Sequence, residues 1–210
     1  MSKSFLIYIP PSNEISNLLE KVSTKLRENH SSNTYIPLYK GKWHSHLMVY
    51  LSPMPVENQN KIIETVSKIT KELRSFKVEL SNIELSESNY MYVGINNEDK
   101  IILEKIHNKL IINLAPFRDG TIKEKYLQKW NSFSKEEKLR IKTTGLPYTY
   151  VPHITLGIFS NRKEQEQARD EALPFNLRGN SFTANRIEIL TSSEGEYINK
   201  EIVFSETFPR

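Results

Sequence analysis

The stretch at residues 151–159, VPHITLGIF, carries the side chains best suited to chemistry. Its apolar composition predicts a β-strand, and successive side chains of a strand point to opposite faces. His153 and Thr155 would therefore share one face, while Ile154 and Leu156 would share the other and pack into a core. An imidazole and a hydroxyl would then lie side by side on an accessible face. One His-x-Thr is a weak signal by itself, so a second copy would matter.

A partial copy lies earlier in the chain, at residues 46–52, HLMVYLS. In both stretches a histidine is followed by alternating apolar residues and, at the end, by a serine. Each stretch precedes a predicted helix and then two predicted strands, so the block strand–helix–strand–strand occurs twice. A duplication of this kind predicts two similar lobes related by a pseudo-twofold axis, with His46 opposite His153.

Two opposed histidines suit acid–base chemistry on a phosphodiester. The unperturbed imidazole pKa of about 6.5 lets one ring accept a proton while the other donates one. Each role is typically worth about 10²–10⁴-fold in rate. A threonine hydroxyl beside the histidine can donate a hydrogen bond to a phosphate oxygen as charge develops there. This chemistry needs no metal ion, and the sequence does not say which histidine is the acid and which the base.

Other interpretations of the histidines stay open. A lone histidine is more often structural, and His-x-His is a known metal spacing on a strand, so His44, His46 and His153 could bind zinc. No acidic residue lies near them in the sequence. His30, at the end of a helix, and His107, beside an apolar helical stripe, are predicted to lie on the surface.

Composition places the chain among globular proteins with a real core. It has 210 residues, of which 38% are hydrophobic and 26% charged, with a net charge of +4 and a pI of about 9.0. Such a mildly basic protein is compatible with a phosphate-bearing partner. The absence of cysteine excludes disulfides and thiolate metal sites. No apolar run approaches the roughly 20 residues of a membrane span, and the N-terminus reads as a strand rather than a signal peptide, so we expect a cytoplasmic protein.

Periodicity and capping signals predict the other elements. Helices are expected from Ser12, as N-cap, to about residue 26, and then at 62–73, from about 98 to 110, at 135–142 and at 162–172. Strands are expected at 5–11, 44–53, 76–85, 90–95, 175–182, 186–190 and 196–204, with an edge strand or loop at 34–43.

Residues 115–148 break this alternation. Within them, residues 121–142 carry seven basic and three acidic side chains. Ser134 followed three residues later by Glu137 is a capping-box signature, which predicts a short helix there. Tyr126, Trp130 and Phe133 would either pack this segment down or stack on bases. We interpret it as a basic insert in a single bilobal domain spanning residues 1–210.

The motif PHITLGIF resembles the second motif of the 2H phosphoesterase superfamily, the LigT-like 2′-5′ RNA ligases and cyclic phosphodiesterases. HLMVYLS falls where the first motif is expected, and the order of elements agrees over residues 1–112 and 150–210. The resemblance implies a bilobal duplicated α+β fold, with two antiparallel sheets backed by helices around a central cleft. It also implies metal-independent hydrolysis of a 2′,3′-cyclic or 2′-5′-linked nucleotide, oligonucleotide or RNA end, without a cofactor or an obligate protein partner.

Carried over to this chain, the resemblance makes His46 and His153 the acid–base pair and Thr155 a phosphate ligand. The chain departs from the pattern at Met48, which stands where the first motif has threonine or serine. A thioether cannot donate a hydrogen bond. The site is then one donor short, or a nearby group replaces it.

The groups expected near this gap are candidates for substrate binding: His44, Tyr50, Lys42 and Tyr150. His44 could instead head the first motif, but we favour His46 because VYLS after it resembles GIFS after His153. The departure at Met48 also keeps open a second function, a non-catalytic protein that binds RNA or nucleotides through a degenerate site.

Overall fold

The computed structural model describes residues 2–37, 45–147, 149–193 and 200–209, and it contains both helices and strands. The strands are β1 (Ser2–Ile9), β2 (Tyr35–Pro37), β3 (Leu47–Pro55), β4 (Phe76–Leu85), β5 (Tyr90–Ile95), β6 (His153–Phe159), β7 (Ser181–Ala184), β8 (Arg186–Ser193) and β9 (Lys200–Thr207). The α-helices are α1 (Asn13–Asn29), α2 (Gln59–Lys71), α3 (Asn97–Leu114), α4 (Glu124–Leu127), α5 (Lys135–Thr144) and α6 (Arg162–Ala172).

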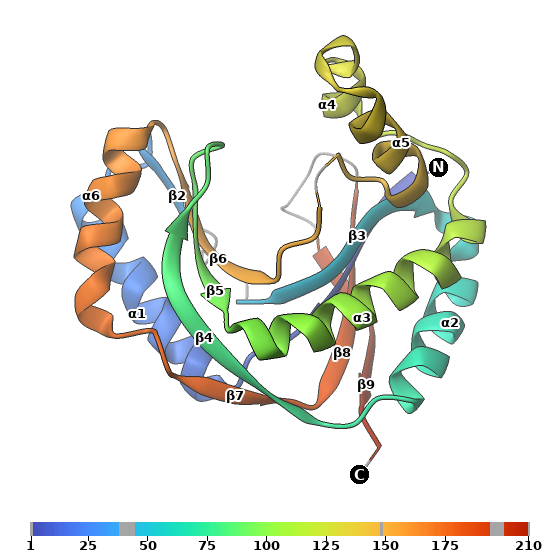
Figure 1. Ribbon diagram of the computed structural model, residues 1–210, viewed down its shortest axis with the longest axis horizontal. Coiled ribbons are helices and arrows are strands. Elements are labelled where there is room, and N and C mark those ends of the chain that lie inside the picture. The colour runs from blue at the N-terminus through green and yellow to red at the C-terminus, as the bar shows by residue number, and fades with distance from the viewer. Residues whose placement is uncertain (1, 38–44, 148, 194–199, 210) are drawn as a thin grey trace.

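The strands form two antiparallel sheets, one in each lobe (Figure 1). The first sheet has the order β3-β1-β8-β9 and the second the order β2-β6-β5-β4-β7. Helices α2 and α3 pack on the first sheet, while α1 and α6 pack on the second. Apolar residues from both lobes form one contiguous core. The expected α+β architecture of two helix-backed antiparallel sheets is confirmed.

The duplicated order of elements does not give one sheet per repeat. Helix α1 follows β1 of the first sheet but packs on the second, and α3 follows β5 of the second sheet but packs on β3. Strands β4 and β5 join β6, and β8 joins the sheet of β3. The repeated unit therefore begins one strand earlier than the sequence pattern indicated, at β1 and at β5. Because the two halves exchange elements, neither lobe is built from one continuous segment.

Side-chain caps begin the helices where the sequence indicated. The Ser12 hydroxyl accepts from the Ile15 amide at the start of α1, and Asn96 accepts from the Asp99 amide at the start of α3. Ser134 and Glu137 form the expected reciprocal capping box of α5. These caps fix where each helix leaves its preceding strand or loop.

The expectations at residues 175–182 and at His107 need correction, whereas an edge strand is present within residues 34–43, as β2. Residues 175–182 were expected to be a strand, but only Ser181–Ala184 pair as β7, because Asn176 and Gly179 adopt positive φ values in the preceding turn. Within residues 34–43 only β2 is described, as an edge strand, and residues 38–44 lie outside the described part. His107 is buried, at 7% exposure, against β3.

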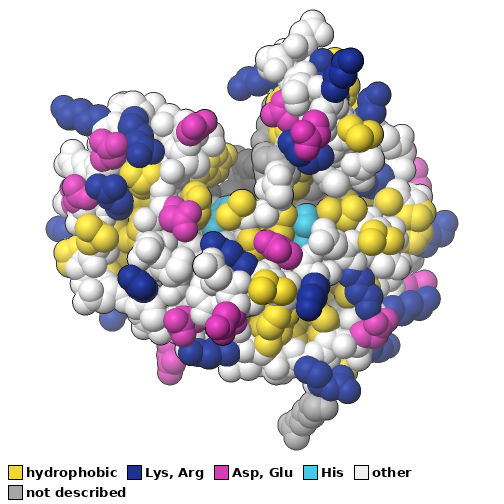
Figure 2. Space-filling view, in the orientation of Figure 1, with side chains coloured by type: hydrophobic (Ala, Val, Ile, Leu, Met, Phe, Trp, Pro, Cys, Tyr) yellow, Lys and Arg dark blue, Asp and Glu magenta, His cyan; other side chains and the backbone are white. Residues whose placement is uncertain are grey.

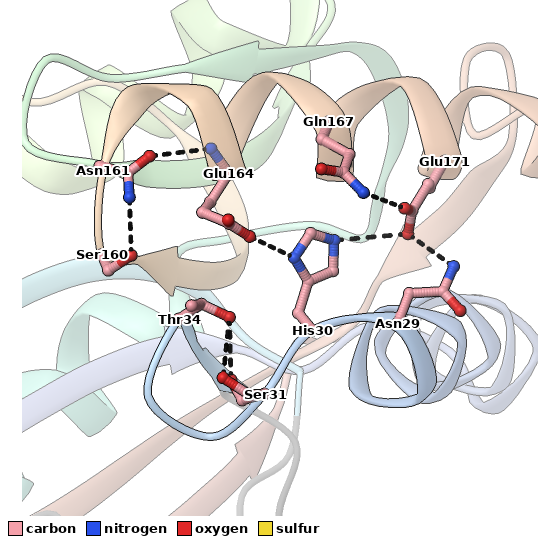
Figure 3. A network of polar contacts seen from close by, with 9 residues as sticks. All are labelled: Asn29, His30, Ser31, Thr34, Ser160, Asn161, Glu164, Gln167 and Glu171. Carbon is pink, nitrogen blue, oxygen red and sulfur yellow. Dashed lines mark hydrogen bonds and ion pairs between the residues drawn. The ribbon is translucent and has the colours of Figure 1, made fainter.

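His30, expected on the surface, is also buried, because it bridges α1 and α6 (Figure 3). Its Nδ1 donates to the Glu164 carboxylate at 2.9 Å, and its Nε2 lies 3.4 Å from Oε2 of Glu171. Asn29 donates to the same Glu171 carboxylate at 2.9 Å. The polar residue at the end of α1 thus joins two helices that are more than 130 residues apart in sequence.

Helices α4 and α5 stand away from both lobes and form an arm (Figure 1). Inside the arm the Tyr126 and Phe133 rings meet edge to face, with 6.0 Å between centroids. Lys138 Nζ and Lys142 Nζ lie 5.8 and 6.0 Å from the centroid of the Trp130 ring. These aromatic side chains therefore pack within the arm itself. None of the helices in the described residues is long and apolar enough to span a bilayer.

Candidate active site

The two histidines of the motifs lie at the starts of equivalent strands. His46 immediately precedes β3, and His153 is the first residue of β6. The two strands contact one another, and they begin near the centre of the molecule and run outward in opposite directions (Figure 1). The space-filling view shows a hollow between the lobe of α6 and the arm, with histidine side chains at its base (Figure 2).

A β-bulge interrupts each of these strands at the same place. Where β1 pairs with β3, Tyr8 is opposite Met48 and Ile7 is opposite Tyr50, so that Val49 is left over. Bulges redirect the side chains that follow them and are common next to active sites. Tyr50 accordingly points into the core, with 1% exposure, whereas Met48 remains half-buried.

The second bulge has the same form. Where β5 pairs with β6, Tyr92 is opposite Thr155 and Met91 is opposite Gly157, so that Leu156 is left over. Thr155 is thus the structural counterpart of Met48. This equivalence supports His46, two residues before Met48, as the head of the first motif.

A bulge leaves a backbone carbonyl outside the hydrogen-bond ladder between the strands, and a buried carbonyl must then accept a hydrogen bond from another group. The Val49 carbonyl accepts from Nδ1 of His107 at 2.6 Å, and the Leu156 carbonyl accepts from the Tyr35 hydroxyl at 3.2 Å. The Tyr35 ring lies where a Cβ at position 157 would be, 2.2 Å from its Cε2. Gly157 therefore makes room for Tyr35.

His153 is fixed in one neutral tautomer by its own backbone. Its Nδ1 donates to the Val151 carbonyl at 2.6 Å, so the lone pair of the neutral ring is on Nε2. Burial lowers the pKa of His153, and this effect is only partly offset by the bond to Val151 and by the negative charge of Glu84. A neutral imidazole whose lone pair is on Nε2 is suited to accept a proton at that atom.

Each motif histidine lies against a tyrosine that is anchored to a glutamate. The His153 and Tyr92 rings have centroids 4.6 Å apart, and the Tyr92 hydroxyl donates to Glu84 at 3.1 Å. Burial and the Glu84 carboxylate raise the pKa of Tyr92 to about 12. The tyrosine hydroxyl therefore stays protonated and remains a donor.

The other half of the site repeats this arrangement. The His46 and Tyr8 rings meet edge to face with centroids 5.7 Å apart, and the Tyr8 hydroxyl donates to Glu188. Glu188 also accepts from Arg186 Nε at 2.9 Å. Burial, reinforced by Glu188, raises the pKa of Tyr8.

Neither the two tyrosines nor the two glutamates were predicted from the sequence, although one signal for the tyrosines was present. Tyr8 and Tyr92 each lie four residues before the N-cap of a long helix, Ser12 and Asn96 respectively. Aligning the repeats from these caps pairs the two tyrosines. Glu84 is opposite Tyr92 across the short β4–β5 connection, whereas Glu188 is close to Tyr8 only through the pairing of β1 with β8, strands that are distant in sequence.

Of the four expected substrate-binding residues, two are buried and two lie outside the described residues. Tyr150 is buried behind β3, where its hydroxyl donates to the Met48 carbonyl at 2.8 Å and its ring stacks on His107 with centroids 4.0 Å apart. Tyr50 is also buried, and its burial raises the pKa of its hydroxyl. Both tyrosines support β3 from the core side in this structure. His44 and Lys42 lie outside the described residues.

Across residues 2–37, 45–147, 149–193 and 200–209, no three His, Asp or Glu side chains are grouped as a metal ion would require. The zinc interpretation depended on His44, which is outside these ranges.

Comparison with known proteins gives a family and a fold. A model of the 2′-5′ RNA ligase superfamily matches residues 11–196. No curated protein matches the chain. E. coli LigT in complex with 3′-AMP superposes with a TM-score of 0.61 at 12% identity, covering 100% of both chains. LigT in complex with ATP gives 0.59 at 14% identity, again over 100% of both chains.

A structure from Thermus thermophilus, TT0787, gives a TM-score of 0.60 at 12% identity, covering 98% of this chain and 97% of the other. At these identities the superpositions establish a shared fold, while the family match covers most of the sequence. The chain belongs to the 2′-5′ RNA ligase superfamily, the 2H phosphoesterases.

Proposed function

We propose that this protein is a metal-independent phosphodiesterase that acts on a 2′,3′-cyclic or 2′-5′-linked nucleotide, oligonucleotide or RNA end. The observation that carries the proposal is the equivalence of its two histidines. His46 lies just before β3 and His153 is the first residue of β6, and these two strands contact one another. Each histidine lies against a tyrosine, and that tyrosine is paired with the residue two positions after the histidine. The nucleotides bound by LigT in its solved complexes, 3′-AMP and ATP, support a nucleotide as the ligand class.

In this proposal His153 is the base for hydrolysis. Its Nε2 takes a proton from a water molecule, whose oxygen attacks phosphorus. The bond from phosphorus to the leaving 2′ or 3′ oxygen breaks, and His46 gives that oxygen a proton. The products are a phosphomonoester and a free hydroxyl. The lowered pKa of His153 and its fixed tautomer support its assignment as the base.

Thr155 would hold a non-bridging phosphate oxygen in the same proposal. Its side chain is half-buried on β6, two residues from His153. A donor aimed at the oxygen that gains charge in the transition state can be worth about 10²–10³-fold in rate. Residues 115–148 would form an insert outside the catalytic core. Its arm stands beside the hollow (Figure 2) and would offer basic side chains to a longer substrate.

A second function, nucleotide or RNA binding without turnover, is favoured by one observation. Met48 occupies the structural position of Thr155 in the other half-site, and methionine donates no hydrogen bond. A site with one donor fewer would keep its affinity for a phosphate better than its rate of cleavage.

The deciding experiment is an assay in EDTA against 2′,3′-cyclic mononucleotides, cyclic dinucleotides and 2′-5′ oligoadenylates, with product identification. We expect cleavage of at least one substrate and losses of about 10²-fold or more in His46→Ala and His153→Ala. His30→Gln is the matched histidine control, because His30 lies between α1 and α6.

Near wild-type turnover in His153→Ala would contradict the assignment of the base. Binding of these ligands without any turnover would favour the second function. Loss of activity in EDTA, with recovery on adding back a divalent metal, would contradict the metal-independent mechanism.

A further inference from the structure

Three residues on adjacent strands form a continuous row in each sheet. In the second sheet, Glu84 of β4 is opposite Tyr92 of β5, which is opposite Thr155 of β6. Side chains of directly opposed residues share one face of the sheet. The glutamate, the tyrosine and the phosphate-binding candidate therefore lie in line on the face that carries His153.

The first sheet repeats this row with one substitution. Glu188 of β8 is opposite Tyr8 of β1, and Tyr8 is opposite Met48 of β3. Two sheets thus have the same glutamate–tyrosine pair at the same place, although their strands come from different parts of the chain. The glutamate–tyrosine pair therefore lies beside both motif histidines.

In the second sheet, the absence of a side chain at Gly94 provides the space for Glu84. Gly94 is the residue opposite His153 in the β5–β6 pairing. A Cβ at Gly94 would lie 2.7 Å from Oε1 of Glu84 and 2.6 Å from the Ser81 hydroxyl. The carboxylate therefore extends over the backbone that faces His153, and a larger residue at position 94 would displace it.

We propose that Tyr92 with Glu84, and Tyr8 with Glu188, are positioning pairs that fix the orientations of His153 and His46. This inference rests on the function proposed above. Each tyrosine hydroxyl is committed to a carboxylate, so the ring is held at both ends, by its strand and by the hydrogen bond. The held ring forms one wall for the imidazole. For His153 the Val151 carbonyl fixes the other side and leaves the lone pair of the neutral ring on Nε2.

The electrostatic surroundings of the two glutamates differ between the halves of the site. Glu84 raises the pKa of His153 against the larger lowering effect of burial, whereas Glu188 is shared with Arg186 and Ser205. Among the residues that the structure describes, the charged and titratable groups that bear on His153 are Glu84 and Tyr92. The glutamate in the second sheet should therefore affect the acid limb of the pH profile more than the glutamate in the first sheet.

The test uses two conservative variants in the second half-site. Tyr92→Phe keeps the ring and removes its anchor, so kcat should fall about 10- to 100-fold while KM changes less than about twofold. Glu84→Gln keeps an acceptor for the tyrosine hydroxyl but removes the charge. It should retain more of kcat than Tyr92→Phe does and shift the acid limb to lower pH. Tyr90→Phe, an exposed tyrosine on the same strand, is the control.

A second readout does not depend on turnover. NMR titration of the His153 imidazole should give a lower pKa in Glu84→Gln than in the wild type, and a less uniform tautomer in Tyr92→Phe. If the wild type cleaves substrate while both variants keep kcat, the pH profile and the imidazole titration unchanged, the positioning inference is wrong and the function stands. If the wild type cleaves nothing, the function is wrong, and an unchanged imidazole titration would overturn the positioning inference as well.

Discussion

Met48 and Thr155 occupy the same position in the two sheets, each opposite a tyrosine across a β-bulge of the same form. Their side chains differ in the one property that phosphate binding needs, a hydrogen-bond donor. The two halves of the site are therefore equivalent in backbone and unequal in chemistry.

Adding a hydroxyl at position 48 and removing the hydroxyl at position 155 test directly whether the two halves of the site differ in hydrogen-bond donation to the phosphate. Met48→Thr supplies a hydroxyl at the equivalent position, so kcat/KM should rise, by about 10-fold if the new donor bonds the phosphate in the transition state. Thr155→Val, which keeps the shape and removes the hydroxyl, should lower kcat/KM about 10²-fold. Steady-state kinetics on the best substrate of the panel measures both.

Two other results are informative for Met48→Thr. An unchanged rate would mean that another group already supplies the donor. A large loss with normal thermal stability would contradict the equivalence, because it would require the thioether itself to contact substrate. Met48→Leu is the matched control, since it keeps the apolar volume without adding a donor.

The pH dependence should reveal the lowered pKa of His153. A base must be neutral to accept a proton, so the acid limb of kcat/KM should follow the protonation of His153 and fall as the pH drops through its pKa. Burial places this pKa below the ordinary histidine value of about 6.5. We therefore expect the midpoint of the acid limb to lie below about 6.5 in a profile measured from about pH 4.5 to 8. A midpoint above that value would contradict the assignment of His153 as the base.

Arg118 should hold the arm in place. Its guanidinium donates to the carbonyls of Lys142 at 2.9 Å and Ile141 at 3.3 Å, at the end of α5. Because burial lowers the pKa of Arg118, part of the cost of placing this charge must be recovered from these bonds. Arg118→Ala should weaken attachment of α5 by about 1–3 kcal/mol, with faster tryptic cleavage at Lys142.

The control for this experiment is Arg74→Ala, an exposed arginine that donates to the adjacent Leu73 carbonyl, far from the arm in sequence. Cleavage in the arm should not accelerate in this variant. If Arg118→Ala also leaves the cleavage rate unchanged, the arm is held by its apolar contacts instead. Comparing kcat on mononucleotide and oligonucleotide substrates would then show whether the arm affects longer ligands.

The network around His30 should stabilise the second lobe without taking part in catalysis. His30→Ala leaves the Glu164 carboxylate without its donor and opens the packing between α1 and α6. Loss of such a bond to a charged partner costs about 1–3 kcal/mol, so the urea midpoint should fall by a corresponding amount. Asn29→Ala, which removes only an exposed bond to Glu171, should cost less. A loss of kcat in folded His30→Ala would contradict this separation.

The sequence by itself determined the strands of the two motifs, the capped helices and the family. These features depend on local spacing, alternation and cap chemistry. Ser12 and the Ser134–Glu137 box mark helix starts from residues at most three positions apart. The same local information led to the expectation of a strand at 175–182, where two positive φ values break the pairing.

Only the tertiary structure decided which strands form each sheet and what surrounds the histidines. The Tyr8–Glu188 bond joins residues 180 positions apart, and His30 reaches Glu164 across 134 positions. Such contacts follow from the exchange of strands and helices between the halves, which no local pattern reports. The bulges at Val49 and Leu156 turned Tyr50 into a core residue and filled the space at Gly157 with Tyr35. Periodicity cannot show this, because a bulge changes which face a residue occupies without changing its neighbours in sequence.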